Sequence, residues 1–218
     1  MDELEITKVE KIIGYEFRDK SLLSVALTHK SYATENACES NQRLEFFGDR
    51  IVNFVVAERL YDDLGGDEGE LNRELSMIVS EIPLAAAVKN MKLMDYCAFG
   101  KGLKKNISSV KDKHISDVFE AVVAAIYLDG GIECARKFVS DKLLSAGYRA
   151  PKDYKTALKE YLDKRGEVMK FESEEECGGK YLSKTVVCGK EFCGRGDKKL
   201  AAEQDAAKSA LEYLAKQN

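Results

Sequence analysis

The sequence predicts an α+β protein, with an all-helical domain over residues 1–148 and a small αβββα domain over residues 153–218. Apolar residues recur at three- and four-residue spacing from Leu4 to about Tyr148, which is typical of amphipathic helices. After Pro151 the pattern changes to short segments rich in β-branched and aromatic residues, flanked by helical segments. A chain of 218 residues is long enough for one large and one small domain.

Apolar stripes identify the main helices of the first domain. These stripes are Leu22, Leu23, Ala26 and Leu27, then Phe46, Phe47, Ile51, Phe54 and Val55, and finally Val118, Val122, Ala125, Ile126 and Leu128. We expect the last of these helices to begin at Ser116. The glycine-rich segments 64–69 and 129–131 are expected to be loops between helices.

The second domain has five expected elements. A helix is predicted at 153–165, strands at 168–174, 181–188 and 190–193, and an alanine-rich helix at 200–215. Glycines at 178–179 and 189 fall where the two hairpin turns are required.

Composition excludes several classes of protein. No run approaches the roughly 18 apolar residues of a membrane helix, and the acidic N-terminus does not resemble a secretory signal, so we expect a cytoplasmic protein without disulfides. Zinc held by Cys177, Cys188 and Cys193 is disfavoured by their spacing. The net charge of -4 argues against a nucleic-acid partner. This objection is weaker for residues 151–218, which hold 14 basic and 13 acidic side chains and are therefore close to neutral.

Two pairs of carboxylates stand at helical spacing within apolar sequence. Glu45 and Asp49 are four residues apart, and Asp117 and Glu120 are three apart, so each pair shares one helix face. Like charges near a core are costly unless a cation lies between them, and Mg²⁺ prefers such oxygen ligands.

Spacing alone leaves an ordinary alternative open. In it Asp117 caps a helix, Glu45 pairs with Arg43 or Arg50, and the other carboxylates face water. The only histidines are His29 and His114, and no GxxxxGK[ST] or GxSxG motif is present, which excludes several rival hydrolytic sites.

The segment Asn41–Asp49, NQRLEFFGD, resembles the signature of the ribonuclease III family. Further blocks match in the same order, namely Gly14–Phe17, Ala26–Tyr32, Asp67–Gly69 and Asp117–Ala121. The αβββα tail is similar to a double-stranded RNA-binding domain, so the resemblance covers the whole chain.

The resemblance implies a homodimeric endoribonuclease that hydrolyses duplex RNA with Mg²⁺, or Mn²⁺ as a substitute, and leaves 5′-phosphate and 3′-hydroxyl ends. Its substrates would be rRNA precursors and mRNA. By the same resemblance, Asp49 and Glu120 are the catalytic residues, Glu45, Asp117 and Glu120 bind metal, and Glu68 supports the site. Phe46, Phe47 and Phe54 would be core or dimer-contact residues.

Two residues depart from the family signature. Gln42 stands where the family usually has a carboxylate, and Arg50 where it has a small residue. We interpret Gln42 as a supporting residue that raises the Mg²⁺ requirement. Arg50 either contacts an RNA phosphate or a carboxylate across the dimer, or only pairs with neighbours near Glu45 or with solvent.

The tail offers lysines for duplex RNA, and they are Lys155, Lys159, Lys180, Lys198 and Lys199. The acidic run 172–176 is expected to weaken this binding. Two alternatives remain: a double-stranded RNA-binding protein of the same fold with weak or absent cleavage, and a helical metal-dependent phosphohydrolase that acts on a nucleotide.

Overall fold

The computed structural model describes residues 2–63, 66–104, 110–147, 153–176 and 178–216. The chain forms two compact units, Met1–Ala150 and Pro151–Asn218. The predicted linker at 149–152 lies outside the described residues. None of the described helices is long and apolar enough to cross a membrane, and the cellular location expected from the sequence stays a prediction.

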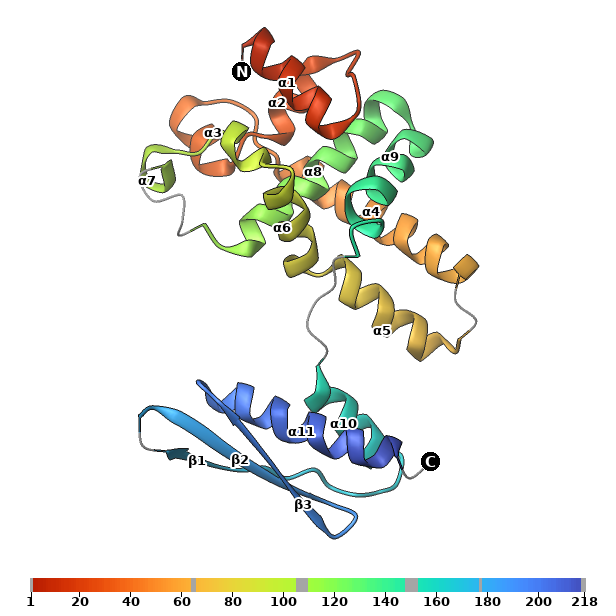
Figure 1. Ribbon diagram of the computed structural model, residues 1–218. Coiled ribbons are helices and arrows are strands. Elements are labelled where there is room, and N and C mark those ends of the chain that lie inside the picture. The colour runs from red at the N-terminus through yellow and green to blue at the C-terminus, as the bar shows by residue number, and fades with distance from the viewer. Residues whose placement is uncertain (1, 64–65, 105–109, 148–152, 177, 217–218) are drawn as a thin grey trace. The chain divides into compact units, whose positions relative to one another are not determined.

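The first unit is helical throughout the residues that the structure describes (Figure 1). Its α-helices are α1 (Glu3–Ile13), α2 (Lys20–Ala26), α3 (Lys30–Asn36), α4 (Gln42–Asp63), α5 (Glu68–Val79), α6 (Glu81–Asn90), α7 (Lys101–Lys104), α8 (Asp112–Gly130) and α9 (Ile132–Val139). A 3-10 turn, η1 (Leu93–Tyr96), follows α6, and a π-helical turn, η3 (Ser140–Leu144), follows α9.

Helix α8 is the centre of this unit. Its residues from Ala121 to Ile126 are 0% exposed, because α2, α4, α6 and α9 pack around it. The contact with α4 is especially close, since a Cβ added at Gly48 would lie 1.8 Å from the backbone oxygen of Glu120. Only a glycine therefore permits this approach of the two helices.

Local hydrogen bonds define where several helices begin. Asp2 and Glu5 form a capping box at α1, and the Asp67 side chain accepts the Glu70 N–H at the start of α5. The Asp129 carboxylate accepts the backbone N–H groups of Arg18 and Asp19, which ties the segment before α2 to the end of α8.

Two of the apolar stripes lie on the predicted helices but are buried only in part. Ile51 and Val55 are buried, but Phe46 is 70% and Phe54 is 53% exposed, because only one face of α4 meets α8. Leu128 is likewise 52% exposed, near the end of α8.

Three predicted boundaries also differ. Helix α8 begins at Asp112, four residues before Ser116, and continues to Gly130 inside the predicted loop 129–131. Helix α5 begins at Glu68, inside the predicted loop 64–69, because the Asp67 cap satisfies its first turn.

The second unit confirms the predicted αβββα order. It consists of α10 (Tyr154–Asp163), an antiparallel sheet of β1 (Glu172–Glu176), β2 (Lys180–Val187) and β3 (Lys190–Gly196) in that order, and α11 (Lys199–Ala215). Both helices lie on one face of the sheet (Figure 1). Positive φ angles at Cys188 and Gly189 form the tight turn between β2 and β3. The described cysteines are free thiols.

The first strand lies further along the chain than predicted, and the third begins at Lys190 as predicted but is longer. The strand predicted at 168–174 occupies 172–176, where Glu172 pairs with Lys184 and Glu176 with Lys180 across the ladder. Opposite charges on these pairs favour this register. Strand β3 extends to Gly196, since Gly194 lets the backbone of α11 approach closely.

Replacing Gly48 with alanine tests the close approach of α4 and α8. We expect Gly48→Ala to lower the free energy of unfolding by about 1–3 kcal/mol, because the new methyl group forces the helices apart. Chemical denaturation measures this change. Gly102→Ala is the control, since the methyl group that it adds would meet no neighbouring atom within 4 Å. An equal loss of stability in both variants would contradict the prediction.

Candidate active site

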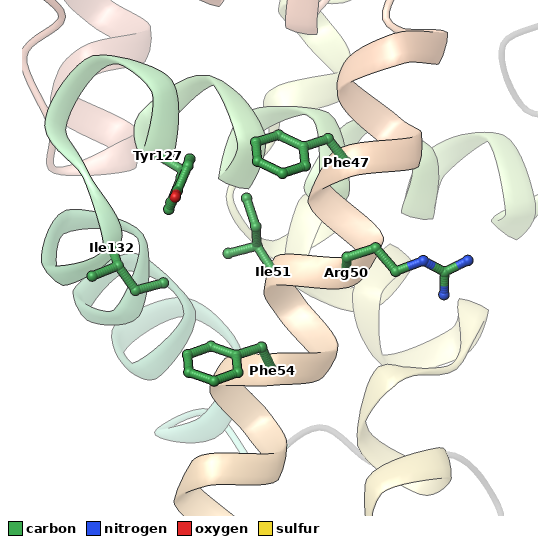
Figure 2. A pocket seen from close by; sticks show the side chains of 6 residues that line it. All are labelled: Phe47, Arg50, Ile51, Phe54, Tyr127 and Ile132. Atoms are coloured by element: carbon green, nitrogen blue, oxygen red, sulfur yellow. The ribbon is translucent and has the colours of Figure 1, made fainter.

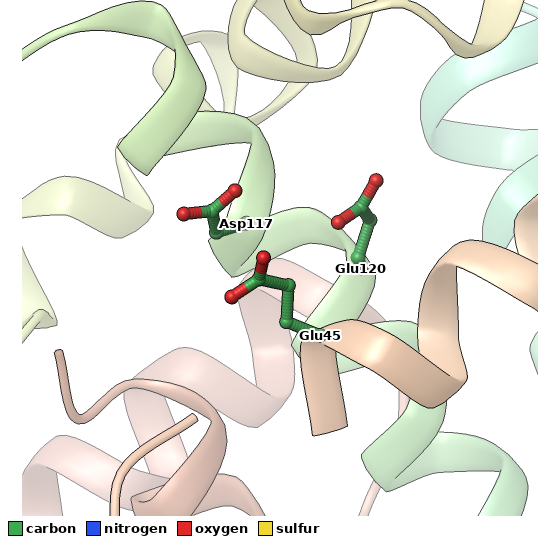
Figure 3. Close-up of side chains that lie close together, drawn as sticks. All are labelled: Glu45, Asp117 and Glu120. Atoms are coloured by element: carbon green, nitrogen blue, oxygen red, sulfur yellow. The ribbon is translucent and has the colours of Figure 1, made fainter. Parts of the chain in front are cut away.

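Three carboxylates from two helices converge beside the α4–α8 contact. Glu45 lies in the first turn of α4, and Asp117 and Glu120 lie one turn apart on α8 (Figure 3). Each of the three offers one oxygen, and these oxygens lie within 4.8 Å of one another. The side chains of Asp117 and Glu120 point toward α4 because their spacing places them on the same face of α8.

Burial disfavours the charged form of all three acids, and neighbouring carboxylates add to this for Glu45 and Glu120. Burial, and then the charges of Asp49, Asp117 and Glu45, raises the pKa of Glu120 from 4.5 to about 8. Burial followed by Asp117 raises the pKa of Glu45, and burial raises that of Asp117. Raised carboxyl pKa values in one cluster indicate a place that a cation would stabilise.

Lys113 and His114 lie beside Asp117 in this cluster. Lys113 Nζ lies 3.9 Å, and His114 Nδ1 3.6 Å, from the Asp117 carboxylate. The His114 ring packs edge to face against buried His29, with 5.2 Å between ring centroids. His29 Nδ1 accepts the Ser31 N–H at the start of α3, so this histidine has a structural part in holding the chain beside the site.

Asp49, which the spacing paired with Glu45, lies next to the three-carboxylate group without belonging to it. Its Oδ2 is 2.9 Å from Arg50 Nη1, and its Oδ1 accepts a hydrogen bond from Asn53 Nδ2 at 2.8 Å. Its charge still acts on Glu120. The sequence did not predict the contact of Asn53 with Asp49, although residues four apart on a helix can make such a contact.

The alternative ion-pair arrangement is wrong for the cluster. Arg43 lies 4.0 Å from Glu39, and Arg50 pairs with Asp49, so neither neutralises Glu45. Asp117 does not cap a helix, because α8 begins five residues before it.

The two predicted supporting residues are exposed. Gln42 is the first residue of α4, one turn before Glu45, and Glu68 is the first residue of α5. Glu68 does not belong to the acidic group found among the described residues.

The candidate RNA-binding lysines divide into two kinds. Lys155 is half-buried. Its Nζ lies 2.6 Å from the buried Glu203 carboxylate and 5.5 Å from the Phe171 ring centroid, so its ammonium group is paired within the domain. The other four candidates are exposed. They are Lys159 on α10, Lys180 at the start of β2, and Lys198 and Lys199 at the start of α11.

An apolar pocket of about 260 Å³ lies on the other side of α4. Figure 2 shows its lining side chains, which come from α4, the end of α8 and the start of α9, and are Phe47, Arg50, Ile51, Phe54, Tyr127 and Ile132. The sequence did not predict this pocket, because its walls come together only in the tertiary structure.

Known proteins resemble this chain along both units. Residues 19–146 match the family model described as Ribonuclease-III-like, and residues 154–214 match the double-stranded RNA binding motif. The chain is 38% identical over 224 residues to Ribonuclease 3 of Bdellovibrio bacteriovorus, with 96% of each chain covered. It is 40% identical over 215 residues to Ribonuclease 3 of Symbiobacterium thermophilum, with 91% of this chain and 90% of that relative covered.

A solved structure gives the same result for the first unit. The nuclease domain of ribonuclease III from Campylobacter jejuni has a TM-score of 0.58 and 33% identity, and the match covers 63% of this chain and 97% of that one. On the family models and the near-complete coverage of its relatives, this chain belongs to the ribonuclease III family.

Proposed function

We infer that this protein is an endoribonuclease that hydrolyses the phosphodiesters of double-stranded RNA and leaves 5′-phosphate and 3′-hydroxyl ends. The observation that carries this function is the group of three carboxylates, from α4 and α8, in a chain whose second domain matches an RNA-binding motif. We further propose rRNA precursors and mRNA as the substrates.

Mg²⁺ fits the three carboxylates, and Mn²⁺ fits as a substitute. The donor set consists of oxygen atoms only, which hard divalent cations prefer, and it leaves room for water and a phosphate oxygen as further ligands. Burial, and then the charges of the neighbouring acids, raises the pKa of Glu120, and a cation would relieve that repulsion. Glu45, Asp117 and Glu120 would hold the ion.

When bound, such a cation makes water a better nucleophile and stabilises negative charge on a phosphodiester. The side chains of the protein position the attacking water. Glu120 is half-buried on α8, and Asp49 stands beside it with a side chain that is 35% exposed. We propose that Asp49 and Glu120 orient the attacking water from these two places.

Gln42 and Glu68 complete the proposed site as supporting residues. Gln42 lies one turn before Glu45 and carries no charge, so the site has less negative charge than a carboxylate there would give. We expect a raised Mg²⁺ requirement for this reason. Glu68 is assigned on the family resemblance of its Asp67–Gly69 block.

The apolar surface of α4 supports a homodimer. Phe46 and Phe54 are 70% and 53% exposed, and the pocket bounded by Phe47, Ile51 and Tyr127 lies beside them. Exposed aromatic patches of this kind mark protein contacts. The Campylobacter jejuni nuclease domain is described as having a region involved in dimer formation. We propose that a second copy of the chain covers this surface.

The exposed lysines of the second unit are proposed to bind the phosphates of duplex RNA. Lys198 and Lys199 stand at the start of α11, where free backbone N–H groups also favour an anion. Such contacts recognise the A-form shape of RNA with little reading of sequence. The acidic strand β1 forms one edge of the sheet and weakens this attraction.

Glu120→Gln tests the nuclease assignment. We expect it to reduce Mg²⁺-dependent cleavage of an end-labelled RNA duplex by about a thousandfold or more, because it removes a ligand and a charge from the site. Duplex binding, measured separately in Ca²⁺, is expected to persist. Glu81→Gln, at the exposed start of α6, is the matched control.

Two outcomes would contradict the assignment. If Glu120→Gln cleaves like the unmodified protein, the carboxylates do not form the active site. If the unmodified protein binds duplex RNA but leaves it whole at high Mg²⁺, the chain is a binding protein of the same fold.

Removal of metal exposes the repulsion among the carboxylates. Glu120 has a pKa of 4.5 when unfolded and about 8 when folded, so the folded state binds more protons between these values and is destabilised as pH rises through them. In EDTA, we expect Glu120→Gln to raise Tm at about pH 8 and to have less effect at about pH 5.5. Thermal denaturation with and without Mg²⁺ checks this, and a pH-independent difference would contradict it.

Lys199→Ala tests the RNA contact of the tail. We expect weaker binding to duplexes of any sequence, and a dependence of log K on log salt that is shallower by about one. Binding assays over a range of salt concentrations measure this slope. Lys216→Ala, beyond the far end of α11, removes the same charge and is expected to leave the slope unchanged.

A further inference from the structure

Both oxygens of the Asp49 carboxylate are engaged by donors of its own helix. Arg50 Nη1 lies 2.9 Å from Oδ2, and Asn53 Nδ2 donates to Oδ1 at 2.8 Å. Asn53 also donates to the backbone oxygen of Asp49 at 2.8 Å, which fixes the amide beside the carboxylate. Asp49 is therefore held in one orientation, next to the group of Glu45, Asp117 and Glu120.

Arg50 stands between the acidic group and the apolar pocket. Its side chain contributes to the pocket wall, while Figure 2 shows its guanidinium pointing away from Phe47, Ile51 and Phe54. The guanidinium also lies 5.9 Å from the centroid of the Phe46 ring. These two contacts, one to an aromatic ring and one to a carboxylate, orient a side chain that is 69% exposed.

The ion pair between Arg50 and Asp49 reduces the negative charge that is available to a cation at the site. The negative charge of Asp49 acts on Glu120, and the Arg50 guanidinium, 2.9 Å from Asp49 Oδ2, offsets part of that charge. A cation that attracts Asp49 must also compete with Arg50 for it. Because the pair is largely exposed, this competition is modest in size and reversible.

We propose that Arg50 is a positioning residue for Asp49, and that its ion pair raises the concentration of divalent cation at which the site fills. This inference rests on the proposed function, since it assumes that the three carboxylates bind the cation. It assigns to Arg50 a contact within its own chain, on the same helix, where the sequence left a phosphate contact and an ordinary surface pair both open.

The test compares metal binding in Arg50→Ser, Arg50→Lys and Arg43→Ser. Arg43 is the matched control, because it lies on the same helix, is 91% exposed and sits 4.0 Å from the Glu39 carboxylate. Stabilisation of the RNA-free protein against heat is followed as Mg²⁺, or in parallel Mn²⁺, is added. Cleavage of an RNA duplex over the same range of Mg²⁺ gives a second midpoint.

For Arg50→Ser we expect both midpoints to fall by about threefold, the scale of an exposed ion pair. Arg50→Lys keeps the charge without the planar fork, so its midpoints should lie between those of Arg50→Ser and the unmodified protein. Arg43→Ser should not move either midpoint. Sedimentation at the same protein concentration reports the oligomeric state of each variant, since Arg50 also lines the pocket.

Three results would overturn the role of Arg50. These are equal midpoints for Arg50→Ser and the unmodified protein, an equal shift in Arg43→Ser, and a shift in Arg50→Ser that occurs only with a change in oligomeric state. If instead the unmodified protein is neither stabilised by Mg²⁺ nor active on duplex RNA, the proposed function itself fails.

Discussion

The contact between α4 and α8 is the constraint on which the nuclease domain depends. At Gly48 the two helices approach so closely that a Cβ would lie 1.8 Å from the Glu120 backbone oxygen. This approach places Glu45 of one helix against Asp117 and Glu120 of the other. A larger residue at position 48 would separate the helices, and with them the carboxylates.

That contact also carries a cost. The same packing that buries α8 desolvates Glu120 and exposes it to three further acids, which together raise its pKa to about 8. The fully buried residues from Ala121 to Ile126 supply apolar stabilisation beside the repelling charges. Functional sites commonly combine a stable scaffold with groups whose charged form is unfavourable until a ligand binds.

The basic side chains of the two units differ in whether they are paired with a carboxylate. Lys155 forms an internal pair with Glu203, and Arg195 pairs with Glu176 across the sheet, so these cations stabilise the small domain. Lys198 and Lys199 are exposed at the start of α11 and remain accessible to phosphates. In the large unit, Arg50 combines both properties, because its side chain is exposed and is also paired with Asp49.

Local pattern by itself determined that the first unit is helical and that the second has the order αβββα, because the periodicity of apolar residues reports which residues share a face. It also identified the two carboxylate pairs, since spacing along a helix sets direction. It did not show which face of α4 would be covered, so it left Phe46 and Phe54 open between the core and a dimer contact. Both are exposed, because α8 covers only one side of α4. Strand β1 was placed too early for a similar reason, because its register depends on pairing with β2. Only the tertiary structure separated Asp49 from the other three acids, through contacts with Arg50 and Asn53 that depend on side-chain orientation.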